Sequence, residues 1–304
     1  MKRLAAVALV CAACASKPAL QVPDSEQYLP PDIEAMSLLG KPLHAPELPA
    51  DERKKREDDL AKAQHAYDIK PDSADAALAT GDRLADLGRY REAIAVYTEA
   101  IRRHPDDPRL LRDRGHRYIN VRRLSDALND LQSAELLEHA KPDAGEEQQI
   151  HYLTGLGNYL SGDFEKALAA YRRSLALSKT PDRLVATSDW LWMTLRRLGR
   201  SKDAEQVLEP ISIDINVADS VAHHQLLLMY EGEIAPEELL RQNANTAEGV
   251  TILYGIGNWY YVNGQTDKAV PIWKRILDGN QSFNFGYVAA EAEMARLDKP
   301  RRSR

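Results

Sequence analysis

Small, apolar and aromatic residues recur along this chain at a spacing of 34 residues, which predicts a repeated unit rather than one irregular domain. Within each unit they follow helical spacing, and Gly88 marks a turn between two helices. A polar insertion, Pro142 to Glu147, lengthens the interval before the third unit. The residues that define the first three units are Gly81, Tyr90, Ala93, Tyr97, Ala100 and Pro105, then Gly115, Tyr118, Ala127, Leu131 and Ala134, then Gly155, Gly162, Phe164, Ala167 and Tyr171.

Two less regular units follow towards the C-terminus, with further helices around them. Asp51 to Lys70 is predicted to be a single helix that caps the open N-terminal end, because stacked repeats need a polar cap for solubility. Val217 to Tyr230 and Pro236 to Gln242 are predicted helices of an irregular insert, and Phe285 to Leu297 is a predicted terminal capping helix. The markers of the fourth and fifth units are Trp192, Leu195, Gly199 and Ala204, then Gly257, Tyr260, Gly264, Ala269 and Trp273.

These repeated residues resemble the tetratricopeptide repeat. Glycine at position 8 of a unit and alanine at position 20 are expected to face each other where its two helices cross, since larger side chains would overpack the contact by ~1–3 kcal/mol. The expected fold is therefore all-α: a solenoid of about five helix-turn-helix units plus capping helices. The resemblance also implies a superhelix that binds peptides or protein segments in its concave groove.

The N-terminus has the features of a secretory signal, and a permanent transmembrane anchor is the less favoured alternative. Lys2 and Arg3 precede an apolar run, Leu4 to Ala15, that is shorter than the roughly twenty residues of a membrane-spanning helix. Cys14 stands where a lipobox would place its lipidated cysteine, and the residues after it resemble an outer-membrane sorting signal. Cleavage after Ala15 and release as a soluble periplasmic protein is the other possibility.

A proline-rich spacer is expected between the signal and the first helix. Its prolines cannot donate backbone hydrogen bonds, so neither a helix nor a regular strand is expected. The stretch is then either an extended linker or a segment that packs across the first helices through apolar residues such as Ile33 and Leu39. We divide the chain into a signal segment (1–15), a spacer (16–50), N-terminal units with a capping helix (51–181), degenerate units with insert and capping helices (182–298) and a basic tail (299–304).

Charge and motifs argue against several functional classes. Forty basic and 46 acidic residues are mixed along the chain, which disfavours a nucleic-acid partner. Both cysteines lie near the N-terminus, so the body can form no thiolate metal site or disulfide. No phosphate-binding loop or hydrolase motif is present, and His223 and His224 are expected to be surface residues. We expect no catalytic residue, no metal and no cofactor.

The last third of the chain more narrowly resembles the new lipoprotein I family of bacterial outer-membrane lipoproteins. This resemblance implies an envelope adaptor, often dimeric, that docks peptidoglycan hydrolases and periplasmic proteases. The stretches that carry it are Trp190-Leu191-Trp192, Ala204 to Leu208, Met229 to Ile234, Glu238-Leu239-Leu240 and Tyr254 to Tyr261.

Candidate binding residues follow from the repeat register, because fixed positions of each first helix point into the concave groove. Tyrosine and arginine are the side chains most enriched at the energetic centres of protein interfaces, although several of these tyrosines could instead pack within the protein or against a dimer mate. The candidates are Arg109, Arg112, His116, Tyr152, Tyr159, Arg196, Arg197, Tyr254, Asn258 and Tyr261.

The sequence thus predicts a non-catalytic protein-binding scaffold in the cell envelope. It would face the periplasm, held at the outer membrane by a lipid on Cys14, and it could form a homodimer. The alternative function is an assembly factor, pilotin-like or for outer-membrane biogenesis, that holds one permanent partner.

Overall fold

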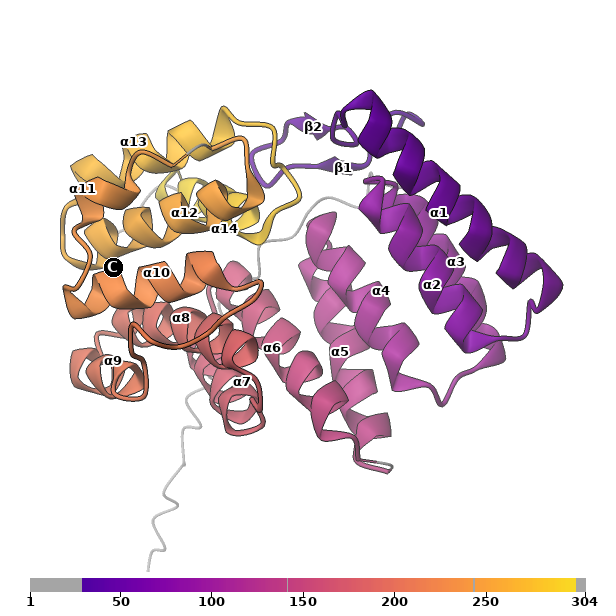
Figure 1. Ribbon diagram of the computed structural model, residues 1–304, viewed down its shortest axis with the longest axis horizontal. Coiled ribbons are helices and arrows are strands. Elements are labelled where there is room, and N and C mark those ends of the chain that lie inside the picture. The colour runs from indigo at the N-terminus through magenta and orange to yellow at the C-terminus, as the bar shows by residue number, and fades with distance from the viewer. Residues whose placement is uncertain (1–28, 141, 243, 299–304) are drawn as a thin grey trace, which may run out of the picture.

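The computed structural model describes residues 29–298 except positions 141 and 243, so the signal segment, Cys14 and the basic tail lie outside the described residues. Most of the described chain is helical, and it begins with a small hairpin of two strands (Figure 1). No helix among the described residues has both the length and the apolar character needed to cross a bilayer.

Antiparallel helix pairs follow one another along the chain, each packed mainly on its neighbours. This arrangement confirms the all-α solenoid expected from the 34-residue spacing. The helices are α1 (Ala50–Ile69), α2 (Ala74–Asp86), α3 (Tyr90–Arg103), α4 (Pro108–Asn120), α5 (Leu124–Glu138), α6 (Ala144–Ser161), α7 (Phe164–Ala176), α8 (Pro181–Arg197), α9 (Ser201–Leu208), α10 (Val221–Glu231), α11 (Pro236–Leu239), α12 (Ala247–Val262), α13 (Thr266–Leu277) and α14 (Phe285–Asp298).

Side chains at the helix starts explain where the first helices of the units begin. Ser73, Asp107, Asp143, Thr180 and Thr246 each accept a hydrogen bond from a backbone N–H of the helix that follows. Such caps satisfy donors that have no partner inside the helix, so these five polar residues define the N-termini of α2, α4, α6, α8 and α12.

In the second unit the glycine at position 8 lies against the expected neighbour, because a Cβ on Gly115 would stand 3.2 Å from the backbone oxygen of Ala127. In the first and third units the neighbour differs from the one expected. A Cβ on Gly81 would stand 2.3 Å from the ring of Tyr97, and one on Gly155 would stand 2.6 Å from that of Tyr171. The position-24 aromatic of the same unit, rather than the position-20 alanine, is therefore the group that excludes a side chain there.

The insert helices are shorter than predicted. The α10 helix begins at Val221 rather than Val217, because the Asp182 carboxylate accepts hydrogen bonds from the backbone N–H groups of 218–220 and holds that segment as a loop. The α11 helix is a single turn that ends at Leu239.

Residues 29–49 pack on the helical body. Strands β1 (Ala35–Met36) and β2 (Pro42–Leu43) pair antiparallel, and Ala35 and Leu43 are buried. The Arg91 side chain donates to the carbonyl of Ile33 (3.0 Å), so this end of the segment contacts the start of α3. Residues 29–49 therefore pack on the first helices and are not an extended linker.

The C-terminal helix α14 does more than cap the last unit. It packs on α12 and α13 and also contacts α6, and every residue from Gly286 to Glu293 is buried. The backbone N–H of Leu38, in the hairpin, donates to Glu291 of α14 (3.2 Å). The hairpin therefore links the first helices to the last one, as its place between them in Figure 1 illustrates.

Candidate functional site

Four of the predicted binding residues belong to the interior of the protein. Tyr159, Tyr254 and Asn258 are at most 1 % exposed. The Tyr254 hydroxyl donates to the Tyr159 hydroxyl (2.9 Å), and that of Tyr159 donates to Asn258 Oδ1 (3.2 Å). The Arg197 side chain is 8 % exposed and forms an ion pair with Glu293 of α14 (2.9 Å). These positions face a helix of the same chain instead of an open groove.

Glu293 is the residue that sequence analysis missed in this cluster. Burial alone would raise the pKa of its carboxyl, but Arg197 and Arg296 outweigh burial and hold that pKa below its ordinary value. An ionised glutamate is therefore paired with two arginines inside the fold. Its sequence signal was a glutamate within a run of small and apolar residues, Val288 to Ala295, that also contains Glu291.

The other aromatic and histidine candidates are also engaged within the chain. The His116 ring packs on Phe285 (5.2 Å between centroids), and burial with nearby Arg117 and Arg112 holds the pKa of that imidazole well below its ordinary value. Tyr152 lies edge-on to Tyr171. Their packing leaves these rings little freedom to contact a partner.

Arg196 and Tyr261 lie at the edge of this interior cluster. Arg196 stacks over Trp192 and donates to Asn263 Oδ1 (2.7 Å). Tyr261 packs against Trp273 and under the Arg197 guanidinium. Both side chains are partly exposed, so they border the surface without forming a separate site.

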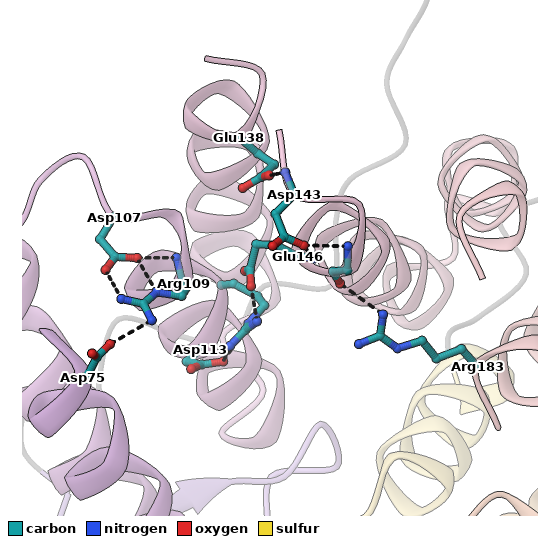
Figure 2. Close-up of polar contacts among 10 residues, drawn as sticks. Asp75, Asp107, Arg109, Asp113, Glu138, Asp143, Glu146 and Arg183 are labelled. Carbon is teal, nitrogen blue, oxygen red and sulfur yellow. Dashed lines mark hydrogen bonds and ion pairs between the residues drawn. The ribbon is translucent and has the colours of Figure 1, made fainter. Parts of the chain in front are cut away.

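Arg109 and Arg112 instead lie near the start of α4, in a charged surface that also includes the starts of α2 and α6. Figure 2 shows Arg109 between Asp75 and Asp107. Arg109 pairs with Asp107 (2.7 Å) and reaches across to Asp75 of α2 (2.8 Å). The Arg109 side chain is 42 % exposed and that of Asp75 is 79 % exposed. Both ends of this bridge are open to a partner.

Arg112 lies deeper in the same surface and joins two helices. Its guanidinium pairs with Asp113 of α4 (2.8 Å) and with Glu146 of α6. Burial raises the pKa of Glu146 to about 7, since the attraction of Arg112 is opposed by Asp113 and Glu138. We call the group formed by Asp75, Arg109, Arg112, Asp113 and Glu146 the charged surface.

The start of α6 is held beside the charged surface. Asp143 accepts hydrogen bonds from the backbone N–H groups of Gly145 (2.8 Å) and Glu146 (3.1 Å), and Arg183 of α8 donates to the Gly145 carbonyl (3.4 Å). Figure 2 places these contacts in one row from α4 to α8. The inserted segment before α6 thus gives Glu146 its place beside Arg112.

The histidine pair is not on the surface as expected. His223 Nδ1 lies 2.7 Å from Asp189 Oδ2, and the buried His224 has its Nε2 2.8 Å from the Ser212 carbonyl oxygen. Tyr230 donates to the other Asp189 oxygen (3.0 Å). His223 and Tyr230 thus join α10 to α8, whereas His224 joins α10 to the loop before it. Among the described residues, no three His, Cys, Asp or Glu side chains are grouped as a metal ion would need.

Comparison with known proteins supports the repeat assignment. Two models described as tetratricopeptide repeat match residues 74–117 and 112–181. No curated protein matches the sequence.

Several solved structures are similar over most of their length. A tetratricopeptide repeat protein from Parabacteroides merdae is 16% identical, with 80% of this chain and 98% of that chain covered and a TM-score of 0.47. BtubC (BKLC) from P. vanneervenii is 17% identical over 84% of this chain and 95% of that chain, with a TM-score of 0.43. MamA is 18% identical over 65% and 92%, with a TM-score of 0.40. At such scores these likenesses carry no argument about function.

Proposed function

Given that this chain is a tetratricopeptide repeat protein, we propose that it is a non-catalytic scaffold that binds other proteins in the bacterial cell envelope. Stacked repeats display long rows of side chains on rigid helices, which suits them to bind protein segments. The envelope location rests on the signal-like N-terminus, with a lipid on Cys14 as the anchor at the outer membrane.

The observation that carries this proposal is the contrast between the two parts of the predicted binding face. Helix α14 covers Tyr159, Tyr254 and Asn258, whereas Arg109 and Asp75 of the charged surface remain exposed. An exposed ion pair contributes only about 0–1 kcal/mol, so a carboxylate of a partner can replace Asp75 beside Arg109 with little loss. Asp107 accepts from Nε and Nη2 of Arg109 and so fixes the guanidinium, while Nη1, which pairs with Asp75, is the group that a partner carboxylate would bind.

The favoured partners are peptidoglycan hydrolases or periplasmic proteases, for which the protein would be an adaptor. This part of the proposal rests on the resemblance of the last third of the chain to new lipoprotein I. The alternative, an assembly factor, would use the same charged surface. It would bind one permanent partner, whereas an adaptor binds several.

The test is an in-cell crosslinking pull-down of the full-length protein with the substitution Arg109→Glu. Tyr159 is unsuitable as a probe because it is buried, so its loss would weaken the fold. Arg102→Glu is the matched control, since Arg102 is 72% exposed on α3 and pairs only with its helix neighbour Glu99 among the described residues.

Several cell-wall hydrolases or proteases that are lost with Arg109→Glu and retained with Arg102→Glu would support the adaptor. One secretion or pilus component at a fixed ratio would support the assembly factor instead. Partners that persist in both variants would remove the charged surface from the proposal.

Fractionation of Cys14→Ser tests the anchor, because the unlipidated protein should leave the membrane fraction.

A further inference from the structure

A second surface of the molecule lies between α1 and α3. These helices leave a cavity of about 620 Å³, which we call the α1–α3 groove. Its apolar part comes from Leu60, Leu84 and Val96, and its polar rim includes Glu57 and Arg89. A volume in this range is typical of sites that hold small ligands or anchoring side chains, roughly 300–1,000 Å³.

Comparison with the next unit explains why this groove is open. In that unit Arg114 of α4 spans from Asp130 of α5 (2.7 Å) to Thr98 of α3 (3.1 Å). Thirty-four residues earlier, the position of Arg114 is held by Thr80 and that of Asp130 by Val96. The short side chain of Thr80 is buried and bonds its own helix, at the Ala76 carbonyl (2.8 Å), so it does not span the neighbouring helices as Arg114 does.

The rim of the groove has more negative than positive charge. Arg89 donates to Glu92, with Nε 2.6 Å from its carboxylate, and it also lies near enough to Glu57 for the two charges to attract. Glu57, on α1, is exposed, so the carboxylates of Glu57 and Glu92 share one guanidinium at this rim. A basic side chain on an occupant would therefore find an available partner.

The shape of the lining favours a helix as the occupant. Glu57, Leu60, Ala61 and Gln64 line the groove at helical intervals along two turns of α1. A partner helix can offer apolar side chains at matching intervals while it satisfies its own backbone hydrogen bonds. An extended segment would leave backbone groups unpaired on this apolar surface, since the groove offers no strand edge.

We infer that the α1–α3 groove docks an amphipathic helix of a partner protein, with an apolar stripe on Leu60, Leu84 and Val96 and a basic residue beside Glu57. This site goes beyond the proposed function because it uses a different surface from Arg109 and its neighbours. The two surfaces together would let one scaffold hold two proteins at once.

The test measures the binding of two labelled helical peptides to the full-length protein by fluorescence anisotropy. Both peptides carry leucines at i, i+3, i+4 and i+7; one has lysines at its polar positions and its twin has glutamates. The lysine peptide should bind saturably and the glutamate twin roughly tenfold more weakly. The substitution Glu57→Lys should abolish or reverse that preference.

The variant Thr80→Arg with Val96→Asp rebuilds in the first unit the pair that Arg114 and Asp130 form in the second. Filling the groove in this way should abolish peptide binding while the helical circular dichroism stays unchanged. Ala95→Trp is an independent filling variant, because Ala95 lines the groove at an exposed position and its change does not disturb the core.

Each other outcome overturns the inference. Absence of saturable binding, equal binding of the twins, or binding that persists in a folded filled variant removes the site. A concentration-dependent dimer that the filling variants abolish would make a second copy of the chain the occupant. Arg109→Glu should leave peptide binding intact, so failure here is distinct from failure of the proposed function.

Discussion

At the scale of the residue, burial and ion pairing have opposite effects on the pKa of the Glu146 carboxyl. It forms an ion pair with Arg112, yet burial and the nearby carboxylates raise its pKa to about 7 from an ordinary value of 4.5. Between these two values the carboxyl is protonated in the folded protein and ionised in the unfolded chain. Its contribution to stability is therefore lost as the pH rises through the folded-state pKa.

We predict that Glu146→Gln becomes progressively more stable than the wild type as the pH rises from 5 to 8. The amide imitates the protonated carboxyl that the site favours, so the difference in unfolding free energy should grow by roughly 1–3 kcal/mol over this interval. Urea denaturation at both pH values measures it. Glu248→Gln, which removes an exposed carboxyl in the first turn of α12, is the control for the loss of a surface charge.

At the scale of the element, the close contact between the two helices of a unit depends on a glycine. The α6 and α7 helices approach so closely at Gly155 that a Cβ there would overlap the Tyr171 ring. In the second unit the same contact is made by a smaller pair, Gly115 and Leu131. A Cβ on Gly115 would stand 3.1 Å from Leu131 Cγ. The partner side chain thus determines how much space remains at the glycine.

We predict that Gly155→Ala destabilises the protein by about 1–3 kcal/mol, although alanine favours a helix over glycine by about 1 kcal/mol. Overlap with the Tyr171 ring outweighs the propensity gain. The same substitution in a Tyr171→Leu background should have a smaller cost, which a double-mutant cycle of urea-unfolding free energies measures. Equal costs in the two backgrounds would contradict this account of the contact.

At the scale of the whole molecule, the last helix is joined to the second unit through a buried ion pair. Arg122, 0% exposed, pairs with Glu291 of α14 (2.9 Å), and Asn120 donates to the Phe283 carbonyl (2.9 Å). Arg122 has a φ of +66°, at a turn position where Gly88 and Gly162 stand in neighbouring units. A left-handed backbone is unfavourable for arginine, so this contact also offsets local strain.

We predict that Arg122→Gly destabilises the protein by roughly 3 kcal/mol, because the relief of backbone strain is smaller than the penalty of leaving Glu291 buried without its partner. Hydrogen exchange should accelerate first in α14 and in the β1–β2 hairpin, which both contact Glu291. The double variant Arg122→Gly with Glu291→Gln should recover part of the loss. A single variant as stable as the wild type would show that this pair does not hold α14 on the second unit.

Local elements were largely predictable from the sequence. Helix caps, turn glycines and the spacing of Tyr97 and Tyr171 act between residues that are near one another in the chain, so the 34-residue pattern predicted the helix pairs. The hairpin at 35–43 was not predictable, since its short strands are held by Arg91 and Glu291 from distant segments. The prediction that His223 and His224 lie on the surface was wrong for the same reason. Their partners, Asp189 and the Ser212 carbonyl, come from other segments and contact them only in the folded protein.

The sequence by itself determined that the chain is a row of helical repeats, because each unit is specified by contacts within a few turns. Only the tertiary structure decided which concave positions stay open. That outcome depends on how the successive units turn, which brings Glu293 of α14 to Arg197 of α8 while Arg109 stays exposed. Small rotations between successive units are set by packing and have no marker in any single repeat.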